Sequence, residues 1–187
     1  TAEACVHHLW FDESDYKELG NKIKCNPSIK SAIDRESLVH AVNDDIIDII
    51  ATDHAPHTLE EKQQPYFSAP SGLPLVQHSL QMLFQQYEQG LFSLETIVNK
   101  ACHNPSRLFN IKDRGFLRED FFADVVVVDP RKNYTISQQN LAYKCGWSPL
   151  EGVSMSFSID MTILNGTIAF KDGYLAKIPN GRELEYN

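Results

Sequence analysis

The chain has 187 residues, a formal net charge of −8 and four cysteines. This length is sufficient to bury a real core, whereas the acidic charge balance argues against nucleic acid or an anionic membrane surface as a partner. No apolar run approaches the length of a membrane span. The cysteines are widely separated and form no Cys-x-x-Cys pair, so we expect free thiols in a reducing cytoplasm.

Strands and helices are predicted to alternate in the first part of the chain. Residues 2–11 are expected to form a strand followed by a loop, and Asp34 is the expected N-cap of a helix that runs to about Asn43. Residues 46–50 are apolar and rich in isoleucine, which is typical of a buried strand in a parallel sheet. This order of elements predicts an α/β fold.

A long loop, from about Asp53 to Ser71, follows the second strand, and loops of this length are usually functional. A helix is then predicted over about 72–89, with Gly90 as its end. Ser93 is expected to cap the next helix, and residues 104–105, Asn-Pro, to open a short one.

The sequence pattern changes to β structure after about residue 110. Residues 123–128 form a β run, and residues 162–170 contain Asn165–Gly166, the strongest short signal for a hairpin. Residues 172–173, Asp-Gly, mark a further turn. We therefore predict two parts, residues 1–110 with strands and helices and residues 111–187 with a small β-sandwich module and a C-terminal tail.

The most informative segment for function is residues 51–58, Ala-Thr-Asp-His-Ala-Pro-His-Thr, which follows the predicted strand. In α/β barrels the carboxyl end of a strand is the active-site face, and one Asp with two His is a candidate metal or acid–base site. A structural interpretation is the alternative, because an Asp after a strand is often a cap or turn residue and Pro56 marks a turn. Spacing alone leaves both interpretations open.

Residues 53–58, followed by Glu-Glu-Lys at 60–62, resemble the signature near the eighth barrel strand of dihydroorotases. These are enzymes of pyrimidine biosynthesis in the amidohydrolase superfamily. Further segments are similar to the family in the same order, and the similarity covers nearly the whole chain. They are the seventh-strand segment at 6–9, the substrate-binding Asn-Pro loop at 24–30, the substrate-contacting loop at 69–74, and the stretches at 104–107, 114–117 and 144–149.

The resemblance implies the C-terminal part of a metal-dependent-hydrolase TIM barrel, comprising its last two strands with their helices, plus a small β module. A complete eight-stranded barrel takes about 250 residues, and the family's His-x-His-x-Arg motif does not occur in this chain. We therefore expect part of a longer zinc-dependent enzyme. By resemblance, the intact enzyme interconverts N-carbamoyl-L-aspartate and dihydroorotate, a small-molecule substrate.

The resemblance also assigns site residues. Asp53 matches the residue that binds the catalytic metal and takes a proton from metal-bound water. Four positions match substrate contacts: Asn26, His57, Ser71 and Gly72. An amide offers both donor and acceptor, an imidazole N–H suits a carboxylate oxygen, and a glycine lets the backbone approach a ligand closely. Without the resemblance, these four would be interpreted as turn or loop residues.

The remaining histidines of these segments receive no ligand assignment. His54 is interpreted as structural or as a support for neighbouring groups. His7 and His8 are weak candidates for metal binding, because adjacent side chains on a strand point to opposite faces. Asp53 is then the only matched metal ligand, so we expect the isolated chain to be inactive and to bind zinc weakly or not at all.

Two alternative functions stay open at this point. One is another cyclic amidase, similar to hydantoinase or allantoinase, which the Asn26–Pro27 loop together with His57 disfavours. The other is a non-catalytic amidohydrolase-like subunit that supports a partner such as aspartate transcarbamoylase, and the presence of Asp53 and His57 argues against it. An incomplete barrel should also leave apolar surface uncovered, which favours a homo-oligomer or pairing with a preceding segment.

Overall fold

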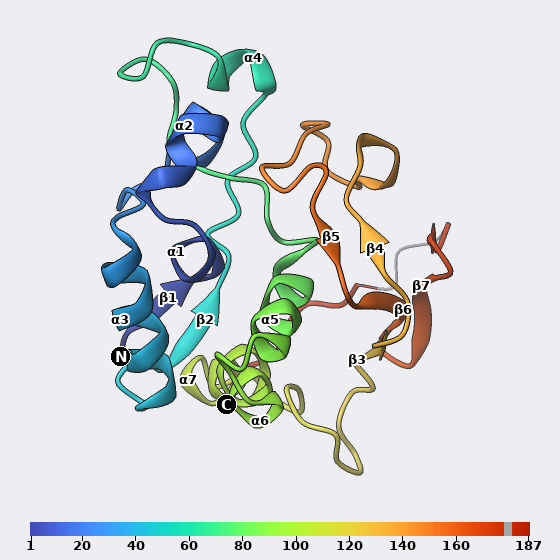
Figure 1. Cartoon of the computed structure of the whole chain (residues 1–187). Coiled ribbons are helices and arrows are strands. Elements are labelled where there is room, and N and C mark those ends of the chain that lie inside the picture. The colour runs from blue at the N-terminus through green and yellow to red at the C-terminus, as the bar shows by residue number, and fades with distance from the viewer. Residues whose placement is uncertain (178–180) are drawn as a thin grey trace.

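Two short parallel strands, β1 (Glu3–Cys5) and β2 (Ile49–Ala51), organise the first part of the chain in the computed structural model, which describes residues 1–177 and 181–187. Glu3 pairs with Ile49 and Cys5 with Ala51. The parallel pairing agrees with the prediction for residues 46–50. Because both strands run the same way, the segments that follow Cys5 and Ala51 begin at the same edge (Figure 1).

The helices are short, and α5 lies between the β1–β2 pair and the second part of the chain (Figure 1). No helix in the described ranges is long and apolar enough to cross a membrane. Their bounds are α1 (Val6–Trp10), α2 (Tyr16–Leu19), α3 (Ala32–Asn43), α4 (Leu59–Lys62), α5 (Ser79–Glu88), α6 (Leu94–Val98) and α7 (Asn104–Leu108), with the 3-10 turns η1 (Glu13–Asp15), η2 (Gly20–Ile23) and η4 (Gln138–Asn140) and the π-helical turn η3 (Asn99–His103).

The segment after β1 is helical, which corrects the prediction of a strand and loop over residues 2–11. The strand stops at Cys5, where its pairing with the three-residue β2 ends, and the backbone N–H of Phe11 then donates to the His7 carbonyl at 3.0 Å. The side chains of His7 and His8 therefore do not alternate across a strand, so the expectation that they point to opposite faces of a strand was wrong.

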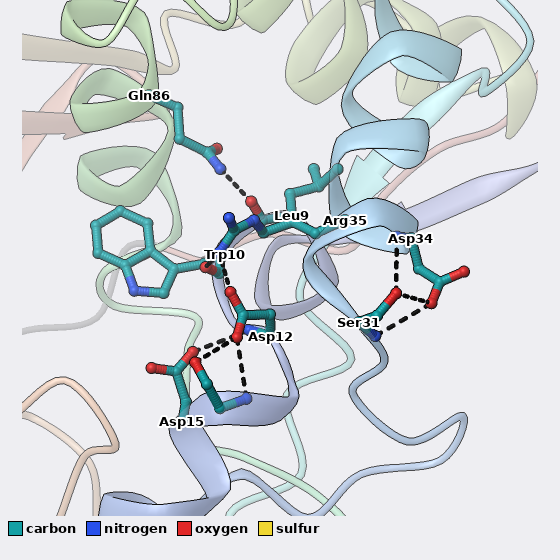
Figure 2. Close-up of polar contacts among 9 residues, drawn as sticks. Leu9, Trp10, Asp12, Asp15, Ser31, Asp34, Arg35 and Gln86 are labelled. Atoms are coloured by element: carbon teal, nitrogen blue, oxygen red, sulfur yellow. Dashed lines mark hydrogen bonds and ion pairs between the residues drawn. The ribbon is translucent and has the colours of Figure 1, made fainter.

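Polar contacts from two other helices fix α1 and the residues that follow it (Figure 2). From α5, the side-chain amide of Gln86 donates to the Leu9 carbonyl at 2.5 Å. From α3, Arg35 forms an ion pair with Asp12 at 2.8 Å and donates to the Trp10 carbonyl at 3.4 Å. These contacts join segments far apart in the sequence, so α1 is held from both sides.

The starts of α3 and β2 differ from the predictions by a few residues. Ser31, not Asp34, is the N-cap of α3: its Oγ accepts the Asp34 N–H at 3.3 Å, and Asp34 accepts the Ser31 N–H at 3.1 Å (Figure 2). The N–H groups of Ile46 and Ile47 both donate to the Ala41 carbonyl at the end of α3. These residues form a turn, so β2 begins at Ile49.

Helix α5 begins at Ser79, whereas the prediction placed its start near residue 72. Residues 72–78 are held in another conformation, because Leu73 bridges to His54 in parallel fashion and the Leu75 N–H donates to His54 Nδ1 at 3.1 Å. The predicted end is confirmed, since Gly90 follows the helix with φ +74°. The predicted cap of the next helix is present at Ser93. The prediction that Asn104 caps a new helix was wrong, because α7 continues directly from the π-helical turn η3 and its N-cap position, His103, is helical and makes no side-chain cap; Pro105 lies in the first turn, as predicted.

The second part of the chain contains an antiparallel sheet in the order β3–β6–β7–β8. Asn165 and Gly166 have φ of +50° and +78°, the backbone that a tight hairpin turn between β6 and β7 requires. Both predicted turns, at 165–166 and 172–173, connect antiparallel strands. The strands are β3 (Val125–Asp129), β6 (Ser158–Leu164), β7 (Thr167–Lys171) and β8 (Tyr174–Leu175), with a separate pair β4 (Tyr134–Thr135) and β5 (Ser154–Met155).

One hydrophobic core contains residues from both sides of the predicted boundary at residue 110. Leu9 of α1 and Met82 of α5 belong to it together with Ile136, Leu150 and Met155 from the second part. The four-stranded sheet lies wholly after residue 110. The position of the sheet supports a division into residues 1–110 and 111–187, whereas the shared core does not. The division therefore stays a prediction.

Candidate active site

Asp53 lies two residues beyond the end of β2, at the edge where β1 also ends. Its φ of +44° is left-handed, a conformation that Asp tolerates better than most residues. The residue is exposed, and its carboxylate makes no hydrogen bond or ion pair with the described residues. An unpaired carboxylate at this edge is available to bind a ligand or to accept a proton.

His57 and Ser71, both predicted substrate contacts, are brought together by the structure. The carbonyl of Ser71 lies 3.1 Å from His57 Nε2, and because a carbonyl only accepts, the proton of the neutral ring is on Nε2. The other ring nitrogen lies 3.9 Å from a carboxylate oxygen of Glu61. The indole N–H of buried Trp147 donates to the His57 carbonyl at 2.8 Å, so the backbone of His57 is also held.

Gly72 is required by the packing of one loop against another. Its φ is +134°, and a Cβ at this position would lie 2.5 Å from the Cβ of Ala55 and 2.9 Å from the Ala55 carbonyl oxygen. The sequence suggested that this glycine admits a ligand to the backbone. The structure gives a second physical reason, which is close contact between the 69–74 loop and the 53–58 loop.

Asn26, the fourth predicted substrate contact, is exposed and is joined to Pro27 by a cis peptide bond. Its side-chain amide makes no hydrogen bond within the described parts of the chain. The same loop is attached to the 69–74 loop, since the Gly72 N–H donates to the Lys24 carbonyl at 2.9 Å and Lys24 Nζ donates to the Ala69 carbonyl at 2.5 Å.

Lys62 connects the loops that carry these residues, although the sequence analysis gave it no role. The side chain is buried, with 2% of its surface exposed. Its Nζ donates to the carbonyls of Lys24 at 3.1 Å, Pro70 at 2.9 Å and Gly72 at 2.9 Å. Burial lowers the pKa of Lys62 to about 8. The only signal in the sequence was its place in the Glu-Glu-Lys stretch at 60–62.

His54 has a structural role, as the sequence suggested. Its Nδ1 accepts the backbone N–H groups of Leu75 at 3.1 Å and Val76 at 3.4 Å, which fixes the segment before α5. Burial lowers the pKa of His54, and this favours the neutral ring that can accept at Nδ1.

A second group of potential ligands lies at the same edge; the sequence analysis gave two of its members, His7 and His8, little weight and gave Cys5 no role. The candidate metal-binding atoms of Cys5, His7 and His8 all lie within 4.8 Å of one another. The expected strand would have separated the two imidazoles, whereas the helical turn of α1 brings them together. The detectable signal was the spacing Cys-x-His-His at the end of a strand.

Comparison with known sequences identifies the family of the chain. Residues 1–169 match the model of the Amidohydrolase family. A dihydroorotase from Clostridioides difficile (strain 630) is 35% identical over 170 residues, which cover 90% of this chain and 40% of that protein. A dihydroorotase from Halobacterium salinarum is 35% identical over 184 residues, covering 98% of this chain and 43% of that protein.

Solved structures agree on the fold. An L-hydantoinase (dihydropyrimidinase) from Arthrobacter aurescens superposes with a TM-score of 0.89 at 24% identity, and a D-hydantoinase (dihydropyrimidinase) from Thermus sp. with 0.84 at 21%; each match covers 93% of this chain and 40% of the other. The predicted class, an α/β segment of a TIM-barrel hydrolase, is confirmed. The chain spans about 40% of the length of the relatives it matches. A family model over most of the chain, together with relatives above 30% identity, shows that this chain belongs to the amidohydrolase family.

Proposed function

We propose that the chain is part of a zinc-dependent dihydroorotase, which interconverts N-carbamoyl-L-aspartate and dihydroorotate in the pyrimidine biosynthesis of the cytoplasm. The observation that carries the proposal is the 35% identity to proteins named dihydroorotase over 90% or more of the chain. The arrangement of the site supports it, since the unpaired Asp53 carboxylate lies at the end of β2 and Lys62 joins the loops of the predicted substrate contacts.

Ring opening of dihydroorotate needs water to add to the amide carbonyl carbon, after which the ring C–N bond breaks and the nitrogen gains a proton. Asp53 is suited to accept the proton that the water loses and to return it to the leaving nitrogen. A bound zinc ion would supply Lewis acidity at the carbonyl oxygen and would lower the pKa of the water. The Asp53 carboxylate fits a zinc ion as a ligand, and the catalytic site would need further ligands from outside the loop that carries it.

The side chains that we propose as substrate contacts differ in whether they already form a hydrogen bond within the protein. The amide of Asn26 is exposed and unengaged, so it can donate to and accept from the amide groups of the ring. The Nε2–H of His57 donates to the Ser71 carbonyl. A substrate carboxylate would therefore bind His57 by exchanging with the Ser71 carbonyl, which frees that carbonyl to accept from the substrate.

The two alternative functions are a hydantoinase-like cyclic amidase and a non-catalytic supporting subunit. The hydantoinase-like alternative has support in the structural matches, but at 24% identity and below these show the fold alone. For a supporting subunit, the partner of choice would be aspartate transcarbamoylase. Binding of that partner and formation of a homo-oligomer both stay predictions. Either interface could cover exposed apolar side chains such as Ile33 and Phe67, which are 74% and 97% exposed.

The test is the intact enzyme that contains this chain, assayed with dihydroorotate, hydantoin and allantoin. We expect turnover of dihydroorotate alone, and a loss of about 10²–10⁴-fold in Asp53→Asn, the typical contribution of a proton-transfer group. Asp44→Asn, an exposed position at the end of α3, is the matched control and should retain activity. Near-normal turnover by Asp53→Asn, or preference for hydantoin or allantoin, would refute the proposal.

A further inference from the structure

Three side chains at the end of β1 and the start of α1 have the composition and spacing of a metal site. The candidate ligand atoms of Cys5, His7 and His8 lie within 4.8 Å of one another. Zinc binds sulfur at about 2.3 Å and imidazole nitrogen at about 2.0–2.1 Å, so two ligands of a tetrahedral site are separated by about 3.3–3.6 Å. Side-chain adjustments of about 1 Å or slightly more would therefore bring all three onto one ion.

His7 is an independent sign that a ligand is bound here. Its side chain is fully buried, and neither Nδ1 nor Nε2 has a hydrogen-bond partner among the described residues. Burial and, to a smaller extent, the neighbouring His8 lower the pKa of His7 to about 3; the backbone of Thr52 lies near enough to oppose this in part, but not in the geometry of a hydrogen bond to the ring. A buried polar group without a partner is costly and calls for an ion, a water molecule or a function. A neutral imidazole is also the form that binds metals.

The hydrogen bond of His8 leaves one ring nitrogen available to a metal. Its Nε2 lies 2.9 Å from the Pro27 carbonyl, which only accepts, so Nε2 carries the proton and Nδ1 has a free lone pair. A hydrogen bond from the second ring nitrogen to a carbonyl is the common support of a histidine ligand. The turn that carries both histidines is fixed by the contacts of Gln86 and Arg35 described above (Figure 2).

Cys5 supplies the sulfur. In the absence of a metal the thiol form is favoured, because burial and the Glu3 carboxylate raise the pKa of Cys5 to about 12, with a smaller contribution from Asp53. Metal binding would replace the S–H bond by a sulfur–metal bond and release the proton to solvent. A second thiol, Cys25, lies 3.7 Å from His8 Nε2 but donates to the Pro27 carbonyl, so we do not assign it as a ligand.

We propose that Cys5, His7 and His8 together bind one zinc ion, with a fourth coordination position open at the edge where Asp53 lies. One thiolate with two imidazoles favours zinc over magnesium or calcium, which prefer oxygen ligands. The inference goes beyond the proposed function, in which Asp53 is the ligand from this chain. It also replaces the expectation that the chain by itself binds zinc weakly, because that expectation treated Asp53 as the only ligand.

Metal binding by the purified 187-residue chain tests the proposal and needs no enzyme activity. The chain is freed of metal under reducing conditions, and zinc is titrated in competition with a chromophoric chelator. Cobalt(II) is then used as a spectroscopic probe, because thiolate ligation gives a sulfur-to-cobalt charge-transfer band. We expect one equivalent of zinc and this band in the unmodified chain.

The variants separate the possible outcomes. Cys5→Ser and His8→Gln should each lose the site or weaken zinc binding by more than roughly tenfold, since even supporting residues contribute about that much. Cys102→Ser, an exposed cysteine elsewhere, is the control and should bind as before. Circular dichroism confirms folding of each variant. No charge-transfer band, or zinc binding that survives Cys5→Ser and is lost in Asp53→Asn, would overturn the proposal while leaving the dihydroorotase assignment intact.

Discussion

Replacing Lys62 by methionine should loosen the loops around the candidate active site. The Nζ group donates to three carbonyls, and one of them, that of Lys24, keeps a second donor in the Gly72 N–H. The carbonyls of Pro70 and Gly72 lose their only donor within the described residues. At about 1–3 kcal/mol for each unsatisfied buried group, the loss is about 2–6 kcal/mol.

Burial of the Lys62 charge has the opposite effect on stability, because it destabilises the folded wild-type protein. The pKa of Lys62 falls from 10.5 to about 8, which corresponds to a cost of about 3 kcal/mol for keeping the amine charged near neutral pH. Methionine removes this cost, so the net destabilisation of Lys62→Met should be small, about 1 kcal/mol from the middle of the range. The loss of a firm attachment between loops should appear as a higher KM in the intact enzyme.

The pH dependence provides the sharper test. Between about pH 8 and pH 10.5 the unfolded chain holds the Lys62 proton and the folded chain does not, so the free energy of unfolding rises with pH through this window. The stability gap between wild type and Lys62→Met should therefore widen from about pH 7.5 to about pH 9.5, measured by urea unfolding. Lys17→Met, at an exposed site, is the control and should show no widening. A constant gap for Lys62→Met would refute the reasoning.

Three further predictions concern the same loops and the chain as a whole. His57→Ala and Asn26→Ala should raise the KM for dihydroorotate in the intact enzyme while metal content, measured by atomic absorption, stays unchanged; loss of zinc would place either residue among the ligands. Gly72→Ala should lower the urea midpoint by an amount equivalent to about 1–3 kcal/mol, because its Cβ would lie 2.5 Å from that of Ala55. Gly146→Ala has open space and φ +71°, so a loss as large as that of Gly72→Ala would contradict the steric argument. The isolated chain should not hydrolyse dihydroorotate with zinc added, and robust turnover would show that its active site is complete.

Local sequence signals predicted those features that depend on a few neighbouring residues. The turn at Asn165–Gly166 was predictable because both positions need positive φ, which these residues accept at low cost. The cap at Ser93 and the helix end at Gly90 depend on similarly local chemistry. The place of Asp53 after a buried strand followed from the apolar run before it, and its proposed chemistry came from the resemblance of the surrounding motif.

Other features could be known only from the tertiary structure, because long-range hydrogen bonds override the local sequence pattern there. Strand β1 ends at Cys5 because β2 offers three residues for pairing, and the chain then turns into a helix that places His7 beside His8. The burial of Lys62 is equally invisible in the sequence, since its three carbonyl partners lie on loops up to 38 residues away. A side chain's local pattern sets its preferences, whereas its partners and its burial depend on how distant segments pack.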